Sequence, residues 1–550
     1  MEISSGFKGI LQKLISGSIK VRAVWGERMR SEILAFKKLL EERRRKVKIY
    51  ASSISSKDSA TFFLIREGYR RKLAIIYPSK NPLDLCTIFL SEEEGDLNGS
   101  LSYKICPCNA QNARELRRIF PYTKPAPIGL APAIGTGDRI GMATPGHIRA
   151  LRAARNAGIK VFPVLAQQSA REMKRTLRSP QEVIDDVTWA VFQESYRDGF
   201  AADADHLKTE EDVRAAFSAG FTMYTIDPSD YVDYEADNCP LHILEEKFNQ
   251  LPWGILKSSK EEMIKRYVGK SFEVKDLNGR PSLKLSFSRE DLLRAAVKYS
   301  SAIAHALKLK KLLDDLFKGE RYDLELSVDE TDAPTKPIEH LFIALELKRL
   351  KINLQSLALR FVGRFEKAID YIGDLEEFER TFQIHALIAR NFGPYKLSIH
   401  SGSDKFSLYP IMGRIAGDII HLKTSGTSYL ESLRIVARHD PSLFREIVKF
   451  SIESFEKDKA SYHVSVDPTQ APPPEKVPDE RLEETYLNNN EMRQILHVTF
   501  GSILSARGEN GKWIFKDRIK KTLLDREEEY YKVISMHIRK HIESLWQIKD

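Results

Sequence analysis

Eight short apolar runs, each ending in polar residues and followed by an amphipathic stretch, most strongly constrain what this chain can fold into. Runs of this length are typical of buried strands, and the stretches between them have the apolar spacing of helices. Eight alternating strand and helix units are the number that closes a parallel barrel. We therefore predict an α/β protein built on a (β/α)8 TIM barrel. The predicted strands are Pro127–Ile134, Lys160–Leu165, Gly199–Ala204, Phe221–Ile226, Tyr322–Val328, Asn353–Leu359, Tyr395–Ile399 and Asp418–Ile420.

The rest of the 550-residue chain is predicted to extend this barrel. Residues 121–460 are the predicted catalytic barrel domain, and residues 1–120 form an N-terminal α+β extension. Residues 229–321 are too many for a plain barrel loop, and the helical pattern from Ser288 to Phe317 predicts a helical insertion there. Residues 461–550 combine a proline-rich crossing segment with C-terminal helices. Thr209 and Gly220 carry the start and stop signals of one barrel helix.

Composition and charge exclude several classes of protein. The net charge of +9 is mild for this length, and the one dense basic run, Glu41–Lys48, is typical of the solvated end of a helix. We therefore expect no nucleic-acid partner. The chain contains no apolar run long enough to span a membrane, and the first 22 residues lack the pattern of a secretion signal. The four cysteines, with Cys106 and Cys108 too close together for a zinc ribbon, favour a cytoplasmic protein.

Polar side chains gather at the predicted carboxyl ends of the strands, which is where TIM barrels carry their active sites. His206, His400 and His421 follow three different strands. Imidazole nitrogens converging on a barrel mouth are good ligands for a divalent metal such as Zn²⁺, Mn²⁺ or Ni²⁺. The alternative for each histidine is a simple hydrogen-bonding role. His147 and His497 are further candidates for the mouth.

Acids, amides and cations share these strand ends. Asp205 and Glu330 are the predicted proton-transfer groups, with Asp203 as a neighbour on the same strand face. The predicted substrate-binding residues are Asp138, Arg139, Gln167, Gln168, Arg360, Lys405 and Lys423. The alternative for the cations is an ion pair with nearby acids. No phosphate-binding loop, dinucleotide fingerprint or nucleophile elbow accompanies them.

Five segments together resemble the tagaturonate epimerase family, which also supplies D-tagatose 4-epimerases. These are GLAPAIGTGDRIGMATPGH, FAADADHLKT, SVDETDAPT, IHSGSDKFSLYP and HLKTSGTSYLESLR. The resemblance implies a cytoplasmic, divalent-metal-dependent epimerase acting at C4 of a ketohexuronate or ketohexose. Asp205-His206 and His400-Ser-Gly-Ser are also similar to the strand ends of class II metal aldolases. In those enzymes the matching histidines bind zinc, and the matching aspartate moves protons.

The two resemblances are chemically compatible. The C2 carbonyl of a 2-ketose does not acidify C4–H, whereas retro-aldol cleavage between C3 and C4 leaves an enediolate that a metal stabilises. Turning the aldehyde and re-forming the bond inverts C4. We therefore predict interconversion of D-tagaturonate and D-fructuronate, or of D-tagatose and D-fructose. Direct deprotonation at C4, a transient oxidation, a true metal-dependent sugar aldolase and a non-catalytic metal-binding barrel remain alternatives, and the oligomeric state, including a homo-oligomer, stays open.

Overall fold

The computed structural model describes residues 26–80, 84–331, 333–424, 426–462 and 464–546. The prediction about a secretion signal in residues 1–22 lies outside these residues. The chain divides into two compact units. Unit 1 takes its described residues from 1–124 and 188–197, and unit 2 takes them from 125–187 and 198–550. Among the described residues no helix is long and apolar enough to cross a membrane.

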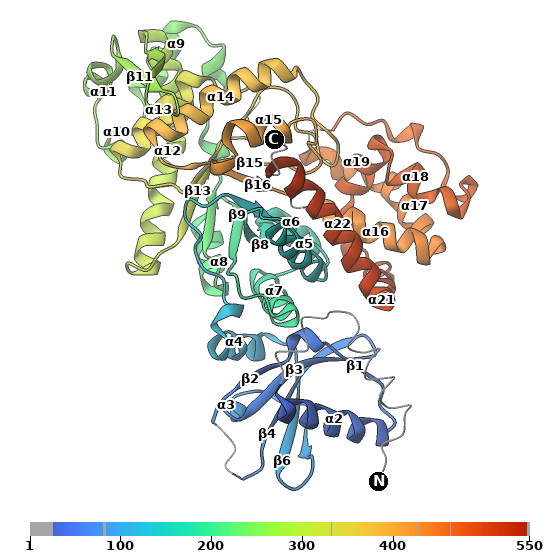
Figure 1. The fold of residues 1–550 in the computed structure, drawn as a ribbon. Coiled ribbons are helices and arrows are strands. Elements are labelled where there is room, and N and C mark those ends of the chain that lie inside the picture. Colours follow the sequence, from blue (N-terminus) through green and yellow to red (C-terminus); the bar gives the residue numbers. More distant parts are fainter. Residues whose placement is uncertain (1–25, 81–83, 332, 425, 463, 547–550) are drawn as a thin grey trace. The chain divides into compact units, whose positions relative to one another are not determined.

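Unit 2 contains a closed barrel of eight parallel strands, as the sequence predicts (Figure 1). The strands follow one another around the barrel in chain order, and the last pairs with the first. They are β7 (Ala133–Gly135), β8 (Phe162–Ser169), β9 (Ala201–Leu207), β10 (Met223–Ile226), β13 (Asp323–Ser327), β14 (Ser356–Ala358), β15 (Lys396–Ile399) and β16 (Ile420–Lys423).

Most strand boundaries differ from the prediction by a few residues, and β8 and β9 extend to Ser169 and Leu207. Two of the differences have clear local reasons. β7 begins only at Ala133, after Pro127 and Pro132, which cannot donate a backbone hydrogen bond. Residues Gly417–Ile419 form a 3-10 turn, η6, instead of a strand. The eighth strand therefore begins at Ile420, and His421 and Lys423 lie inside it.

Helices connect the strands and cover the barrel. Helix α8 begins at the Thr209–Asp212 capping box and ends at Gly220, whose φ of +96° is left-handed, as predicted. The connecting helices are α5 (Thr144–Asn156), α6 (Ala170–Thr176), α7 (Pro180–Glu194), α8 (Glu210–Ala219), α12 (Arg289–Phe317), α13 (Pro337–Arg349), α14 (Leu375–Phe392), α15 (Tyr409–Ala416) and α16 (Thr427–His439).

The long segment between β10 and β13 contains the predicted helices and, in addition, a two-stranded antiparallel sheet. Its turn is closed by Asp276 Oδ1, which accepts hydrogen bonds from the backbone N–H groups of Asn278 and Arg280. Gly279 adopts a φ of +77° there, which favours glycine. The elements are η4 (Ser229–Tyr231), η5 (Tyr234–Asp237), α9 (Leu241–Asn249), α10 (Trp253–Leu256), α11 (Lys260–Tyr267), β11 (Ser271–Lys275) and β12 (Pro281–Ser286).

The C-terminal part of the chain is helical and packs on the barrel helices (Figure 1). α22 lies so close to α5 that a Cβ on Gly146 would come within 2.7 Å of Ile534. The proline-rich stretch forms short 3-10 turns. The elements are α17 (Pro441–Asp458), η7 (Lys459–Ser461), η8 (Pro468–Gln470), η9 (Pro474–Lys476), η10 (Asp479–Arg481), α18 (Leu482–Tyr486), α19 (Asn490–Val498), α20 (Phe500–Ser505), α21 (Lys516–Asp525) and α22 (Glu527–Trp546).

Unit 1 has the mixed α+β character predicted for the N-terminal extension. Its antiparallel sheet has the order β1-β3-β4-β6-β5, with β2 paired to β3. Phe36 of α2 packs against Phe63 and Tyr103 on one face, while Phe62 and Phe120 meet on another. The elements are α2 (Glu27–Glu42), β1 (Val47–Ile49), η2 (Ala51–Ser53), β2 (Ser55–Lys57), β3 (Ala60–Glu67), β4 (Arg70–Pro78), α3 (Asp84–Thr87), β5 (Glu93–Asp96), β6 (Leu101–Pro107), α4 (Ala110–Ile119) and η3 (Pro121–Thr123).

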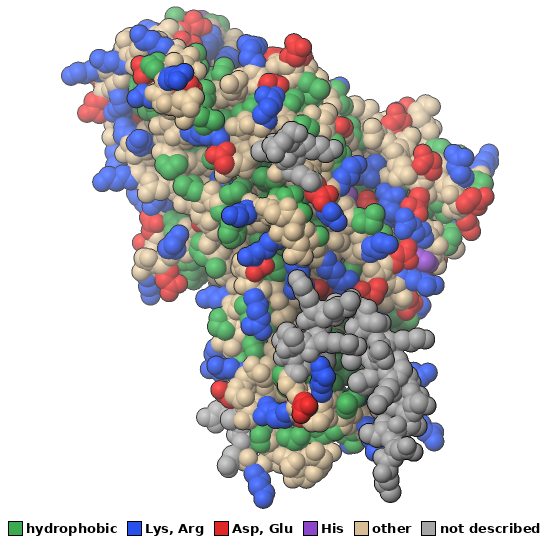
Figure 2. Space-filling view, in the orientation of Figure 1, with side chains coloured by type: hydrophobic (Ala, Val, Ile, Leu, Met, Phe, Trp, Pro, Cys, Tyr) green, Lys and Arg blue, Asp and Glu red, His purple; other side chains and the backbone are tan. Residues whose placement is uncertain are grey.

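The basic run at the end of α2 is held by ion pairs within unit 1. Arg43 lies 2.9 Å from Glu93, and Arg45 lies 2.6 Å from Glu67. On the face shown in Figure 2, Lys and Arg side chains are interspersed with Asp and Glu. The run Glu41–Lys48 was predicted to be a helix end, but only its first two residues belong to α2, and it continues through a turn into β1.

Candidate active site at the barrel mouth

The interior of the barrel carries a buried glutamate that the sequence analysis missed. Alternate residues of a barrel strand face the interior, and on β13 these are Asp323, Glu325 and Ser327. Glu325 is fully buried, and its Oε1 lies 2.7 Å from Lys423 Nζ and 2.7 Å from His400 Nε2. The available signal was an acid in the middle of an apolar strand, with alternating polar residues on both sides.

Lys423 of β16 lies at the centre of a group of buried acids and is not a free cation. Its Nζ lies 2.8 Å from Asp203 Oδ2, 2.7 Å from Asp205 Oδ1 and 2.7 Å from Glu325 Oε1. Burial alone would lower the pKa of Lys423, but the three carboxylates raise this pKa well above its usual value. Lys423 therefore carries its charge into the interior of the barrel.

The pKa values of the two aspartates of β9 are shifted in opposite directions. Burial raises the pKa of Asp203 to about 7 despite the proximity of Lys423. Burial acts on Asp205 as well, but Lys423, His206 and His400 outweigh it and hold the pKa of Asp205 well below its usual range. Asp205 is therefore ionised at neutral pH. Gln167 of β8 donates a 2.9 Å hydrogen bond to Asp205 Oδ2 and orients this carboxylate.

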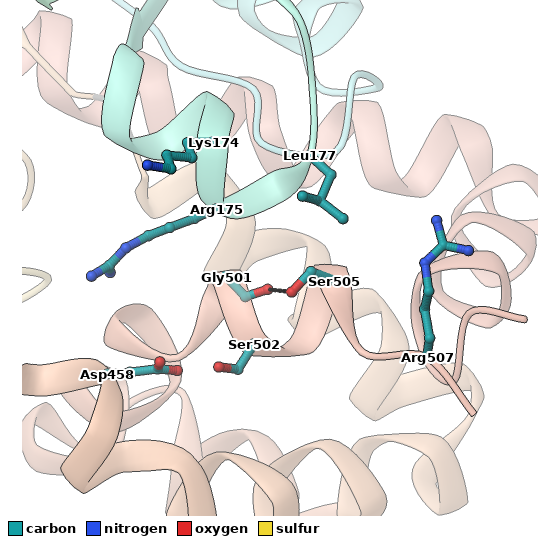
Figure 3. Close-up of a pocket in the computed structure, with 8 residues that line it drawn as sticks. All are labelled: Lys174, Arg175, Leu177, Asp458, Gly501, Ser502, Ser505 and Arg507. Atoms are coloured by element: carbon teal, nitrogen blue, oxygen red, sulfur yellow. Dashed lines mark hydrogen bonds between the residues drawn. The ribbon is translucent and has the colours of Figure 1, made fainter. Parts of the chain in front are cut away.

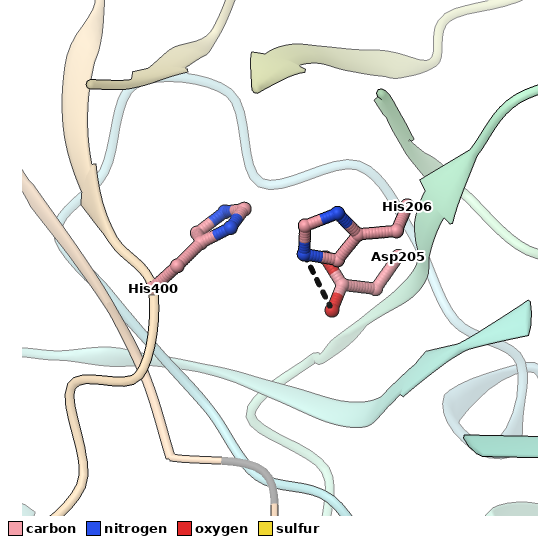
Figure 4. A group of neighbouring side chains, drawn as sticks. All are labelled: Asp205, His206 and His400. Carbon is pink, nitrogen blue, oxygen red and sulfur yellow. Dashed lines mark ion pairs between the residues drawn. The ribbon is translucent and has the colours of Figure 1, made fainter. Parts of the chain in front are cut away.

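Asp205 and His206 are neighbours in the chain, yet both side chains face the same gap as His400 (Figure 4). In a regular strand, adjacent side chains point to opposite faces. The left-handed φ of +54° at His206 breaks this alternation at the end of β9. The rings of His206 and His400 have centroids 4.9 Å apart. One ligand atom from each of Asp205, His206 and His400 lies within 4.8 Å of the others, so this group could hold a metal ion.

Carboxylates hold both of these imidazoles. His206 Nδ1 lies 3.1 Å from Asp227 Oδ2, and His400 Nδ1 lies 3.2 Å from Asp329 Oδ1. Burial lowers the pKa of His206, but Asp205 and Asp227 outweigh it, and this pKa rises to about 9. The pKa of His400 likewise rises to about 10, because Asp329 and Glu325 outweigh burial. Each ring has an acidic partner that can orient it.

His421 does not belong to the group of ligand atoms that lie within 4.8 Å of one another. It is fully buried in β16, and its Nδ1 lies 3.3 Å from Glu325 Oε2. Burial lowers the pKa of His421 to about 4, so this imidazole is neutral at neutral pH. Its Nε2 is buried and has no hydrogen-bond partner among the described residues. Glu325 thus connects His421 to His400.

A cavity of about 420 Å³ opens over these side chains, which is within the range of roughly 300–1,000 Å³ typical of small-molecule sites. Of the predicted site residues, those that line it are Gln167, Asp205, His206, Glu330, Arg360, His400 and Lys423. Glu330 is more exposed than Asp205, and its Oε1 lies 3.6 Å from Arg171 Nη2. Tyr462, from the C-terminal part of the chain, also lines the cavity.

Asp138 and Arg139 do not line this cavity. The Asp138 carboxylate accepts backbone hydrogen bonds from the loop that leads into α5, including one of 2.7 Å from Gly141. Arg139 is buried, donates a 2.8 Å hydrogen bond from Nε to Glu172, and stacks on Phe500 at 3.6 Å. The polar loop therefore shapes the backbone beside the barrel rather than presenting its charges to the cavity.

Gln168 and Lys405 are also engaged away from the cavity. Gln168 follows Gln167 in β8 and accepts a 3.1 Å hydrogen bond from Arg178. The fully buried Lys405 donates to three backbone carbonyl oxygens, those of Glu366, Ile369 and Ser403. A strand-end position alone does not tell which way such a side chain turns.

The two alternative histidines are buried elsewhere. His147 Nε2 lies 2.8 Å from Ser428 Oγ, and His497 Nε2 lies 3.5 Å from Arg139 Nη2.

Three cations that the sequence analysis did not select line the cavity, namely Arg171, Arg364 and Lys367. Arg171 lies in the first turn of α6, and the other two lie in the loop between β14 and α14, where no strand end marks them.

A second cavity, of about 350 Å³, lies beside α6 and α20 (Figure 3). Its charged lining residues are Lys174, Arg175, Asp458 and Arg507. Ser505 Oγ donates a 2.7 Å hydrogen bond to the carbonyl oxygen of Gly501 there. This cavity has no histidine in its lining, so the cavity over β9 and β15 is the candidate active site.

Comparisons with known proteins agree on one family. Residues 50–545 match the family described as UxaE, tagaturonate epimerase. The curated tagaturonate/fructuronate epimerase of Thermotoga maritima is 42% identical over 497 residues, which cover 90% of this chain and 96% of that protein. A glycerol complex of fructuronate-tagaturonate epimerase UxaE from Cohnella laeviribosi is 37% identical, with a TM-score of 0.84 over 94% of this chain and 100% of that chain. The native structure of that enzyme is 36% identical with a TM-score of 0.83, at the same coverage of both chains.

Proposed function

Since this chain belongs to the tagaturonate epimerase family, we propose that it interconverts D-tagaturonate and D-fructuronate by inverting the configuration at C4. It is an epimerase of the isomerase class. The observation that carries the proposal is the 42% identity, which extends over 96% of a curated tagaturonate/fructuronate epimerase. The cavity at the carboxyl ends of the barrel strands supports it independently, because active sites of this fold lie there.

The residues at the mouth fit a divalent cation, and we propose that His206, His400 and His421 bind it beside Asp205. Asp205 and the first two histidines already lie within 4.8 Å of one another. His421 offers a buried Nε2 without a partner among the described residues. Neighbouring carboxylates raise the pKa values of His206 and His400, so the site favours positive charge there, and a divalent cation would supply it in place of the two protons. When bound, such a cation polarises the ketose oxygens and stabilises negative charge on the C1–C3 fragment.

We propose that epimerisation proceeds by retro-aldol cleavage of the C3–C4 bond. This reaction requires two proton transfers at O4. A base accepts the O4 proton while the C3–C4 bond breaks, C4 becomes an aldehyde, and the bonding electrons pass to C3. The aldehyde then turns, C3 attacks its other face, and an acid returns a proton to O4. We propose Asp205 and Glu330 for these two roles, because both line the cavity from different strand ends. No net oxidant or reductant is needed.

The surroundings of Asp205 suit a group that must keep its position during the reaction. Lys423 lies 2.7 Å from one carboxylate oxygen, and Gln167 donates a hydrogen bond to the other. All three side chains are buried, which restricts their movement. The four free cysteines fit a reducing compartment and support the further proposal that the enzyme acts in the cytoplasm.

Turnover of the purified protein tests the proposed function. Tagaturonate, fructuronate, tagatose and fructose are supplied separately, with Mn²⁺, Zn²⁺ or Ni²⁺ and with a chelator, and the products are separated by chromatography. We expect chelator-sensitive interconversion of the two uronates. Release of three-carbon fragments without any epimer would instead identify an aldolase, and no conversion of any of the four sugars would refute the proposed activity.

A further inference from the structure

The lining of the candidate active site comes from several connections of the barrel. Asp205, His206 and His400 lie at the ends of β9 and β15. The cations come from other connections. Arg171 lies in the first turn of α6 after β8, while Arg360, Arg364 and Lys367 lie between β14 and α14. A cavity lined by several cations can orient a substrate that carries a negative charge at one end.

Arg171 is only partly satisfied by the protein. Its Nε is buried and has no hydrogen-bond partner among the described residues. Its Nη2 lies 3.6 Å from Glu330 Oε1, which is a loose ion pair. The guanidinium carbon lies 5.3 Å from the ring centre of Tyr462, which holds the group in place from the C-terminal segment. A buried guanidinium N–H without an acceptor is costly, so this geometry favours an incoming anion.

Lys367 has a neutral partner instead of an acidic one. Its Nζ donates a 2.6 Å hydrogen bond to Ser401 Oγ, and no carboxylate of the described residues lies within 4.0 Å of it. Burial lowers the pKa of Lys367, and the nearby charge of Arg171 lowers this pKa further. Two cations that face one cavity repel each other until an anion binds between them.

The other cations of the cavity are distinguished by their partners. Lys423 is surrounded by three carboxylates. Arg364 is 58% exposed and lies 3.5 Å from Glu366. The Arg360 side chain makes no ion pair among the described residues. Arg171, Arg360 and Lys367 are therefore the cations that remain available to a ligand.

We propose that Arg171, Arg360 and Lys367 bind the C6 carboxylate of the substrate and thereby make this site select hexuronates over neutral ketohexoses. The inference rests on the proposed function and names the residues that would set its specificity. With the carboxylate held by these three cations, the rest of the substrate lies in the cavity that Asp205 and His206 also line. Arginine matches a carboxylate with paired N–H groups, and lysine adds a point charge.

The same contacts would keep the reaction an epimerisation. Cleavage of the C3–C4 bond divides a hexuronate into a C1–C3 enediolate and a C4–C6 aldehyde that carries the carboxylate. The C4–C6 fragment must turn without leaving. A carboxylate fixed by Arg171 and Lys367 allows rotation about the bonds to C4 while the fragment stays bound. Loss of one cation is therefore expected to release three-carbon fragments as well as to slow epimerisation.

The test compares Lys367→Met and Arg171→Gln with the unchanged protein. For the uronate pair we expect kcat/KM to fall by about 10- to 100-fold in either variant, as for a lost hydrogen bond to a charged group. Turnover of tagatose and fructose should stay close to that of the unchanged protein, and Lys367→Arg should recover most of the uronate activity. Lys310→Met is the matched control, because Lys310 pairs with Asp314 on α12 and does not line the cavity. An equal loss for uronates and neutral sugars, or no loss for uronates, would overturn the proposal.

Binding measured by calorimetry separates this proposal from the proposed function. The unchanged protein should bind tagaturonate more tightly than tagatose, and Lys367→Met should remove that difference. If no sugar is epimerised but this pattern holds, the activity is wrong while the carboxylate site stands. If the unchanged protein binds both sugars equally, the carboxylate site is wrong whatever the turnover shows.

Discussion

Replacing Lys423 by methionine should destabilise unit 2 by leaving buried carboxylates without their cation. Lys423 Nζ lies within 2.8 Å of Asp203, Asp205 and Glu325, and all four side chains are buried. Removal of one partner of a buried ion pair costs about 3–5 kcal/mol. At ~2.1 cal/mol/K per residue, roughly 400 residues give an unfolding entropy near 0.9 kcal/mol/K. The midpoint of thermal unfolding should therefore fall by roughly 3–6 °C.

Scanning calorimetry of chelator-treated protein at pH 7 and a fixed scan rate measures this shift. Glu325→Gln is made alone and together with Lys423→Met. Because the two side chains share one interaction, the double variant should lose less than the sum of the single losses. A midpoint unchanged by Lys423→Met would contradict the reasoning, and so would strictly additive losses.

Three further predictions concern other parts of the molecule. His400→Ala should weaken Mn²⁺ binding by more than about 100-fold in a competition assay with a chelating dye, since it removes a proposed ligand; unchanged affinity would exclude His400 from the metal site. Gly426→Ala should lower the free energy of unfolding by more than about 1 kcal/mol, because φ at Gly426 is +111° and a Cβ would lie 2.7 Å from Arg139 Nη2. An unchanged midpoint of thermal unfolding would contradict this geometry. In unit 1, the hydrogen bond from Arg45 lowers the pKa of Glu67 to about 2, although burial opposes it. This stabilisation is present above the unfolded pKa of about 4.3 and is lost as the pH falls toward 2, so Glu67→Gln should lower stability at pH 6 but not at pH 2, as followed by circular dichroism. A stability difference that is equal at both pH values would refute it.

The barrel could be predicted because every strand and helix repeats the same pattern of burial. The order of all eight strands follows from the apolar runs. The hairpin of β11 and β12 was missed because its strands are short, partly exposed and enclosed by helical patterns. Its signal was the turn from Asp276 to Gly279. The domain boundaries near residues 120 and 460 stay a prediction.

The candidate site was only partly predictable from the sequence. His206 and His400 could be selected because they lie at the carboxyl end of β9 and directly after β15, where the fold brings side chains together. Lys405 follows a strand as well, but its burial against backbone carbonyl groups depends on how a distant loop folds. Arg171 and Lys367 enter the cavity from a helix and from a loop, so no local pattern distinguishes them from ordinary surface cations.

The most direct test of the account is the conversion of D-tagaturonate by the metal-supplied protein in D₂O, followed by nuclear magnetic resonance. Retro-aldol cleavage leaves the hydrogen on C4 in place while the aldehyde turns. The account therefore predicts that fructuronate accumulates with protium at C4. Deuterium at C4 would contradict cleavage between C3 and C4 and indicate direct deprotonation, and the absence of fructuronate would contradict the epimerase itself.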